Sequence, residues 1–281
     1  VTFSGNTADY GGGGMYLSTF SNSILTDVTF SGNTADYGGG GMYLRESSPT
    51  LTDVIFSDNT GNLFGGGMYL SISSNSTLKS VTFSGNTADY GGGMNISYSS
   101  STLTDVTFHS NTAEVSGGGL QARYSNIQIT RSDFLFNSVY STTKSTYGGG
   151  LNYFNYNNTD NNSFQISIRN SNFNNNNVSS TPSDEFAAGG GLSIGQFNDN
   201  SLISLEIIGC RFEHNSAESY GGMQISGEHL DFVIDSTQVM YNEALYYSSA
   251  GGFDGCAGSV SNSIISNNKI TEDNSPTSSA L

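Results

Sequence analysis

The chain has 281 residues, a formal net charge of −16 and only 8 Lys and Arg residues. Such a charge excludes nucleic-acid binding, since phosphate contacts require clustered basic side chains, and an anionic membrane surface would repel the chain. No apolar stretch is long enough to insert directly into a membrane. The length suits one substantial core, and the repeats described next favour one elongated domain.

A repeated frame begins at the first residues and continues through nearly the whole chain. The string TFSGNTADYGGG occurs unchanged at Thr2–Gly13, Thr29–Gly40 and Thr82–Gly93. Its first anchor, Phe-x-x-Asn, places phenylalanine at Phe3, Phe30, Phe56, Phe83, Phe108, Phe134, Phe173 and Phe212, with Val239 and Ile265 in the last two units. The asparagines are Asn6, Asn33, Asn59, Asn86, Asn111, Asn137, Asn176, Asn215, Asn242 and Asn268.

The second anchor is a pair of glycines before a large apolar residue. That residue is Met15, Met42, Met68, Met94, Leu120, Leu151, Leu192, Met223 or Phe253. The period is about 26 residues, with two longer units, which gives roughly ten units. A period in this range indicates a solenoid, because one unit cannot bury its apolar side alone.

The alternation inside each unit predicts short strands. Val28 and Phe30 face one way and Thr29 the other, and Met42 and Leu44 alternate with Tyr43. Period two in Val, Thr, Phe and Tyr indicates strands, and Gly, Asn, Asp and Ser clusters indicate turns. We expect an all-β, single-domain parallel β-helix over residues 1–270, with about three strands per coil, and a polar tail or linker over 271–281.

Stacking gives the anchors physical reasons. Phe rings and Met or Leu side chains in register fill the interior. A stacked Asn tolerates the left-handed conformation at a corner and bonds local backbone, while the glycines allow positive φ or close packing. These residues are therefore interpreted as structural ladders.

The pairing of Phe-x-x-Asn with Gly-Gly-apolar resembles the repeats of chlamydial polymorphic outer-membrane proteins. It is also similar to repeats in secreted right-handed β-helix proteins of the pectin-lyase-like superfamily. The resemblance covers about residues 1–268, although that family's second motif usually has Ala where this chain has Met or Leu. It implies a right-handed, extracellular or cell-surface rod for adhesion or architecture and identifies no reaction.

The two cysteines and the Asn-x-Ser/Thr sequences are the candidate positions for covalent modification. Cys210 takes the inward position of Val28, and Cys256 is aligned with the outward Ser18, so two free thiols are expected rather than one disulfide. Among the Asn-x-Ser/Thr sequences, Asn161 and Asn177 lie in insertions and are the candidate N-glycosylation sites.

Acidic residues offer only a weak metal site. Asp27, Asp53 and Asp105 share the position three before the frame Phe, and these either are solvated or bind Ca²⁺ weakly. No calcium-loop motif supports the second alternative, no other cofactor is expected, and no nucleophile–base pair is evident.

Two outward features are candidate contact sites for a partner or a glycan. Tyr16, Tyr43 and Tyr69 form an aromatic strip that either packs against a sugar or protein or only stabilises the sheet. Insertions at Ser138–Tyr147, Asn155–Ser163, Asn177–Ala188 and Gly195–Ser201 form either a binding face or tolerated surface drift.

The uniform frame favours a non-enzymatic rod, since an active site requires one coil to differ from its neighbours. We expect a segment or subunit of a surface filament or appendage. It would self-associate end to end or continue in a longer chain, because the sequence starts inside a repeat and an unpaired coil is a template for further strands. The alternative is a carbohydrate-binding or carbohydrate-cleaving protein. Its carboxylates would be drawn from Asp184, Glu185, Asp199, Glu206 and Glu213.

Overall fold

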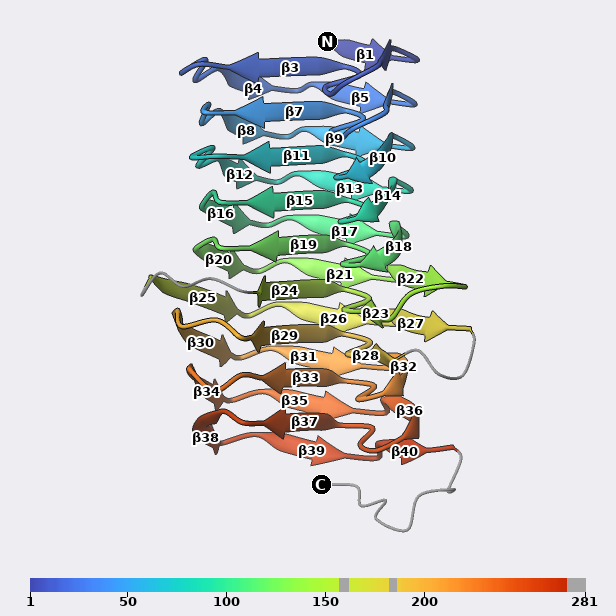
Figure 1. The fold of residues 1–281 in the computed structure, drawn as a ribbon, viewed down its shortest axis with the longest axis vertical. Coiled ribbons are helices and arrows are strands. Elements are labelled where there is room, and N and C mark those ends of the chain that lie inside the picture. The colour runs from blue at the N-terminus through green and yellow to red at the C-terminus, as the bar shows by residue number, and fades with distance from the viewer. Residues whose placement is uncertain (157–161, 182–185, 272–281) are drawn as a thin grey trace.

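The computed structural model describes residues 1–156, 162–181 and 186–271, and the regular elements in these ranges are all strands. The strands form four parallel sheets, here named A to D, that run along one axis (Figure 1). The chain passes through A, B, C and D in turn and begins the next coil in A. This is the right-handed parallel β-helix predicted from the sequence, with ten strands in sheet A.

Each complete coil passes through four sheets, and the prediction of about three strands per coil was wrong. The additional corner falls between sheets C and D, where residues such as Glu46 (φ 53°) and Tyr98 (φ 52°) adopt the left-handed conformation. A positive φ ends a strand because it turns the backbone out of the extended region. No glycine marks this corner in most coils, so the sequence carries little sign of it.

Sheet A contains the frame phenylalanines, each in the middle of its strand. Phe3 lies opposite Phe30, and the same register continues to Val239 and Ile265 in the last coils. The strands are β1 (Thr2–Ser4), β5 (Thr29–Ser31), β9 (Ile55–Ser57), β13 (Thr82–Ser84), β17 (Thr107–His109), β21 (Asp133–Leu135), β26 (Asn172–Asn174), β31 (Arg211–Glu213), β35 (Gln238–Met240) and β39 (Ile264–Ser266).

Sheet B follows the asparagine corner, and in the two long coils its strand is split by an insertion. Both β22 and β23 pair with β18, and both β27 and β28 pair with β32. The strands are β2 (Thr7–Ala8), β6 (Thr34–Ala35), β10 (Thr60–Phe64), β14 (Thr87–Tyr90), β18 (Thr112–Ser116), β22 (Ser138–Ser141), β23 (Thr146–Tyr147), β27 (Asn177–Ser180), β28 (Ala187–Ala188), β32 (Ser216–Ser219), β36 (Glu243–Tyr246) and β40 (Lys269–Ile270).

Sheet C follows the glycines and places the Met or Leu anchor inward. The strands are β3 (Met15–Ser18), β7 (Met42–Arg45), β11 (Met68–Ser71), β15 (Met94–Ser97), β19 (Leu120–Arg123), β24 (Leu151–Tyr156), β29 (Leu192–Phe197), β33 (Met223–Ser226) and β37 (Gly251–Asp254).

In the last strand of sheet C, the sequence alignment of Phe253 with the Met or Leu anchor was wrong. Gly251 lies opposite Met223, and Phe253 lies opposite Ile225, so Phe253 does not take the place after the glycines. The glycines of this coil instead make room within the strand. A Cβ on Gly252 would lie 2.1 Å from a ring carbon of Tyr220.

Sheet D returns the chain to sheet A. Its strands are β4 (Ile24–Thr26), β8 (Thr50–Thr52), β12 (Thr77–Lys79), β16 (Ser101–Thr104), β20 (Ile127–Thr130), β25 (Ser163–Arg169), β30 (Leu202–Ile208), β34 (Leu230–Asp235) and β38 (Ala257–Ser261). Strands β25 and β30 are longer than those before them, and with β24 and β29 they widen the middle of the rod (Figure 1).

The core is one continuous column inside the coils. Neighbouring frame phenylalanines from Phe3 to Phe212 stack with ring centroids 4.5–4.9 Å apart. From Phe30 onwards these rings are fully buried. Because every coil shares its apolar face with the next, the stability of the rod comes from coil-to-coil contacts rather than from any coil alone.

Candidate functional site

The asparagine ladder is the most regular polar feature of the rod. The Oδ1 atom of Asn86 accepts hydrogen bonds from the backbone N and from Nδ2 of Asn59, both at 3.0 Å. Its Nδ2 donates to Phe56 O and to Asn111 Oδ1, both at 2.9 Å. The same pattern repeats along the ladder, so each side chain ties three successive coils together.

The sequence predicted the left-handed conformation at the ladder asparagines, and this was wrong, because none of them has a positive φ. The preceding residue does, for example Gly32 (φ 61°) or Asp58 (φ 56°). This turn directs the next side chain inward, where Asn33 and Asn59 are fully buried. A buried amide is stable there because its donors and acceptor are all paired.

Both axial edges of this ladder have unmatched groups. Asn6 Oδ1 accepts no hydrogen bond from any described residue, although every internal ladder oxygen accepts two. At the other edge the backbone N of Asn268 has no acceptor among the described residues, whereas Asn242 N donates to Asn268 Oδ1 at 2.9 Å. The two edges are therefore complementary: one presents a donor and the other an acceptor at the same frame position.

The predicted exposed tyrosine strip is wrong for two of its three members. Tyr43 and Tyr69 are only 3% and 4% exposed, while Tyr16 in the first coil is 47% exposed. A second aromatic line at the glycine corner covers them, with Tyr37 packed against Tyr69 and stacked on Tyr10. Burial raises the pKa of the Tyr43 and Tyr69 phenols, because it disfavours the charged phenolate.

A groove opens where smaller amides replace these tyrosines. Asn95, Gln121 and Asn152 follow Tyr69 in register along sheet C. They line a cavity of about 350 Å³ whose walls include Phe64 and Phe154. The volume lost in exchanging a phenol for an amide thus becomes open space on the surface.

A second groove lies at the corner between sheets C and D, with a volume of about 630 Å³. Its lining includes Asn75, Tyr98, Ser100, Tyr124, Asn126 and Phe164. Sequence reasoning did not single out these residues. The sequence does contain a sign of this groove, because Tyr98 and Tyr124 occupy the same position in successive coils, each directly before a serine of one ladder.

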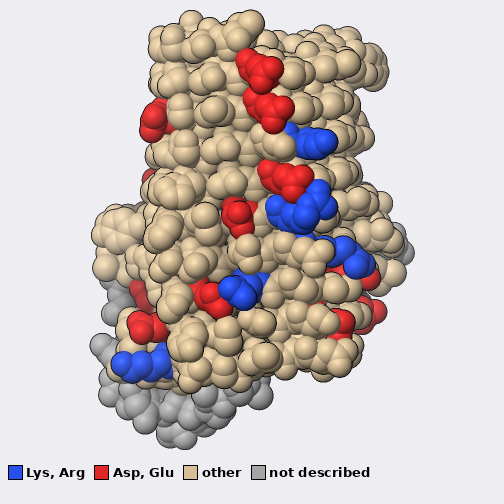
Figure 2. Space-filling model, turned by 180° about the vertical axis from the view of Figure 1, so that it is seen from behind, with Lys and Arg blue, Asp and Glu red and all other residues tan. Residues whose placement is uncertain are grey.

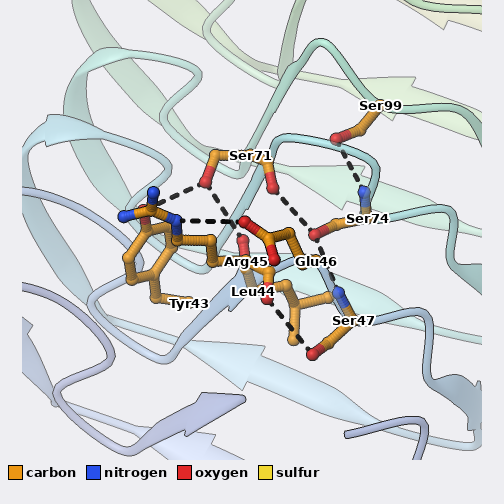
Figure 3. A network of polar contacts seen from close by, with 8 residues as sticks. All are labelled: Tyr43, Leu44, Arg45, Glu46, Ser47, Ser71, Ser74 and Ser99. Carbon is orange, nitrogen blue, oxygen red and sulfur yellow. Dashed lines mark hydrogen bonds and ion pairs between the residues drawn. The ribbon is translucent and has the colours of Figure 1, made fainter. Parts of the chain in front are cut away.

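That serine ladder fixes the corner beneath the second groove. The backbone N of Ser47 donates to Ser74 Oγ at 3.3 Å, and the N of Ser74 donates to Ser99 Oγ at 3.1 Å (Figure 3). The pattern continues through Ser125 to the hydroxyl of Tyr153. Buried hydroxyls paired with backbone in this way hold the corner residues in one conformation.

Most of the described residues of the insertions lie in strands. Residues 155–163 include the end of β24 and the start of β25, and residues 195–201 include the end of β29, where Asn155 pairs with Gln196. Residues 138–147 and 177–188 include β22, β23, β27 and β28. The end of β24 and the start of β25, here named the ledge, form one end of the second groove through Phe164.

The candidate glycosylation sites have different outcomes. Asn161 lies outside the described residues. Asn177 is exposed but begins strand β27 rather than lying in a loop, and its Oδ1 accepts a hydrogen bond from Ser216 Oγ at 2.8 Å.

The candidate calcium ligands occupy the corner between sheets D and A. Asp27, Asp53 and Asp105 have φ between 53° and 56°, which directs their side chains outward. Arg131 bonds Asp105 at 2.8 Å and holds the pKa of its carboxyl below the usual value. No set of three or more His, Cys, Asp or Glu side chains in the described ranges is placed to hold a metal ion. Calcium binding therefore stays a prediction.

Charged side chains are sparse and arranged mainly in lines along the axis. Figure 2 shows the face opposite to that of Figure 1, where acidic and basic side chains follow one another down the rod on a mostly uncharged surface. Some charges of opposite sign form ion pairs across neighbouring coils, as Arg131 does with Asp105.

The carboxylates named for a cleaving enzyme lie apart. Asp199 is buried at the corner before β30, Glu206 pairs with Arg169 at 2.7 Å in sheet D, and Glu213 lies in sheet A. Asp184 and Glu185 fall outside the described residues.

Neither cysteine forms a disulfide. Cys210 is buried, and its Sγ contacts Ile168 O at 3.4 Å. Cys256 does not share the position of Ser226, which lies opposite Asp254, and its half-buried side chain packs against the core instead of facing outward.

The family of the chain follows from this fold. The family model described as a right handed beta helix region matches residues 1–164, more than half of the chain. The chain therefore belongs to the right-handed β-helix family. Comparisons with curated proteins and with solved structures gave no match. Among the described residues no helix could span a membrane.

Proposed function

We propose that this chain is a non-enzymatic extracellular rod whose axial edges pair with further coils of the same repeat. Those coils belong either to a longer chain or to a second copy, as in a surface filament or an appendage. The observation that carries the proposal is the complementary pair of unmatched groups at the two ends of the asparagine ladder, Asn6 Oδ1 and Asn268 N.

The backbone at the N-terminal edge supports the same geometry. Within the rod, Thr34 N donates to Asn6 O at 2.9 Å and Thr60 N donates to Asn33 O at 2.9 Å. Thr7 holds the equivalent position in the first coil, so its N–H points toward the place of a preceding coil. Exposed edges of this kind pair readily with another strand.

The location outside the cell is supported by the composition and by the resemblance to the repeats of polymorphic outer-membrane and pectin-lyase-like proteins. The surface is rich in Ser, Thr, Asn and Gly, and the chain has only 8 Lys and Arg residues. The separate positions of Asp199, Glu206 and Glu213 favour the structural role over polysaccharide cleavage.

Electron microscopy and analytical ultracentrifugation of the 281-residue chain test the proposal. We expect rods longer than one chain, with a length distribution that shifts upward with protein concentration. Thr7→Pro removes the edge N–H and should shorten the rods, whereas Thr7→Val also removes the hydroxyl but keeps the N–H and should not.

Mass spectrometry of the native protein tests whether the pairing coils belong to a longer chain. In that case the native protein should contain further coils of the repeat continuous with either edge. Single rods at every concentration, together with a native protein that has no further coil at either edge, would overturn the proposal.

A further inference from the structure

The groove at the corner between sheets C and D has the chemistry of a binding site and goes beyond the structural role. Its volume of about 630 Å³ falls within the range of small-ligand pockets, about 300–1,000 Å³. It runs along the axis over four successive coils and ends at the ledge made by β24 and β25. Neither the axial edges nor the family assignment uses this groove.

One wall of the groove is a pair of stacked tyrosines held outward by the backbone. Tyr98 and Tyr124 have φ of 52° and 49°, and their rings stack with centroids 4.7 Å apart. Tyr98 is 56% exposed. The serine ladder beneath fixes the backbone of both corners, so the aromatic face is in place before a ligand arrives.

The ledge fixes the second ring more firmly. The hydroxyl of Tyr124 accepts a hydrogen bond from Tyr156 N at 2.9 Å and donates to Tyr156 O. In this position Tyr124 caps the end of β24, which extends beyond its neighbour β19. Phe164 of β25 stands 6.3 Å from the Tyr124 ring and closes the groove.

The opposite side of the groove is a row of hydrogen-bond donors. Asn75 Oδ1 accepts from Ser100 N at 2.6 Å, Ser100 Oγ accepts from Asn126 N at 3.3 Å, and Asn126 Oδ1 accepts from Gln165 N at 2.8 Å. These bonds use the oxygens and orient the side chains. The Nδ2 groups of Asn75 and Asn126 have no acceptor in the described part of the chain and are free to donate to a ligand.

Among the described residues, the lining contains hydroxyl, amide and aromatic groups and no Asp, Glu, Lys or Arg. Arg123 is not part of this lining; its guanidinium lies 5.8 Å from the centre of the Tyr98 ring and bonds Ser97 Oγ at 2.7 Å. A charged ligand would therefore lose its hydration without gaining an ion pair.

We propose that this groove binds a neutral saccharide. A sugar ring presents a flat C–H face, which suits the exposed ring of Tyr98, and hydroxyl oxygens, which accept from Asn75, Ser100 and Asn126. Aromatic side chains combine apolar area with defined geometry, and a few placed polar groups orient the ligand. A charged polymer has no ionic partner among the described lining residues. An extended peptide finds no free strand edge, because Tyr124 bonds the backbone at the end of β24 and Asn126 bonds the backbone of β25.

The sugar has two possible sources, because Asn75-Ser76-Thr77 is an N-glycosylation sequence inside the groove. The ligand is either a separate saccharide or a glycan attached to Asn75. Thr77 is exposed and lies outside the lining, so Thr77→Val removes the acceptor sequence without changing the groove.

The first experiment uses the chain produced in a bacterial host that adds no N-glycans. Neutral oligosaccharides of glucose, xylose, mannose and N-acetylglucosamine, in α and β linkages, are the probes, and saturation-transfer NMR and calorimetry are the readouts. We expect at least one probe to bind. Tyr98→Ala should weaken binding about tenfold, and Asn126→Asp, which keeps the acceptor for Gln165 N and removes the donor, about fivefold.

Two matched controls separate a binding effect from a folding effect. Tyr241→Ala removes a tyrosine with the same backbone conformation (φ 56°) and similar exposure at another corner. Asn22→Asp makes the conservative change in the same ladder outside the groove, where Asn22 Oδ1 accepts from Ser48 N. Both controls should bind within about twofold of the unchanged chain, and thermal melting checks that all variants fold.

The outcomes are distinct. Absence of binding to every probe, or equal binding by Tyr98→Ala and Tyr241→Ala, would overturn the proposal, as would binding of a neutral Ser/Gly-rich peptide in place of any sugar. Expression in a secretory host then identifies the source. Binding that is blocked in the unchanged chain and restored by Thr77→Val indicates an attached glycan, and equal binding by both indicates a separate one.

Discussion

Removing one asparagine from the middle of the ladder should destabilise the rod far more than removing one from its surface. Asn86 is fully buried and takes part in four side-chain hydrogen bonds, with Asn59, Phe56 and Asn111 as partners. Each bond contributes about 1 kcal/mol net, so Asn86→Ala should lower the free energy of unfolding by about 4 kcal/mol. The backbone N–H of Asn59 is left buried without an acceptor.

The matched control is Asn62→Ala in sheet B of the preceding coil. Asn62 is exposed, and its single side-chain bond, from Nδ2 to Asp36 Oδ1, is 3.2 Å long. We expect a change within about 0.5 kcal/mol. The two variants differ only in which asparagine is removed, so they isolate the ladder contribution.

Urea unfolding followed by tyrosine fluorescence gives the global effect, since the chain has no tryptophan. Solenoids open locally, so native-state hydrogen exchange should accompany it. In Asn86→Ala the amide of Asn59 should exchange much faster, while amides several coils away keep their protection. Equal destabilisation by both variants, or unchanged exchange at Asn59, would refute the ladder as a main source of stability.

Three further predictions concern close packing and titration. Gly93→Ala should cost about 3 kcal/mol of unfolding free energy, because its Cβ would lie 2.6 Å from a backbone oxygen of the next coil. Gly32→Ala, at φ 61° with no atom within 4 Å, should cost only about 1–2 kcal/mol. Burial raises the pKa of Tyr69 above its ordinary 10.0. The neutral phenol's contribution to the free energy of unfolding is therefore complete below pH 10 and is lost as the pH rises further. Tyr69→Phe should reduce that loss in urea titrations. Burial raises the pKa of Cys210 to about 11, so a thiol reagent at neutral pH should modify the half-buried Cys256 first.

Each of these has a contradicting result. Equal costs for the two glycine variants would show that the next coil yields to an added methyl group. Stability that is independent of pH above the tyrosine range, or a Tyr69→Phe variant that loses as much as the unchanged chain, would place the phenol in water. Modification of Cys210 in the folded chain before Cys256 would contradict its burial in the core.

Most of the fold could be predicted from the repeated sequence. Stacked coils need the same side chain at the same place, so Phe30, Asn33 and Met42 recur visibly, and their recurrence identified the coil, its interior and the polar ladder. The predicted parallel β-helix is confirmed, and the register from Phe3 to Ile265 follows the sequence alignment. Local pattern sufficed because each coil contacts mainly its neighbours.

Corner geometry was less visible in the sequence. The left-handed residue at the asparagine corner is Gly32 in one coil, Asp58 in the next and His214 further on, and no shared residue type marks it. The corner between sheets C and D varies in the same way. Stacking onto preceding coils imposes a positive φ on residues that would not choose it alone, so four strands per coil could not be inferred.

The sequence alone determined the coil, its inward faces and the regular ladders, because these are one-dimensional properties that repeat with the chain. The tertiary structure decided which outward residues remain exposed. Tyr43 and Tyr69 are covered by a neighbouring corner, and Tyr98 and Tyr124 form a groove only because β24 and β25 extend beyond the coils before them. Exposure depends on what packs alongside from other corners and coils, and no spacing within a single repeat contains that information.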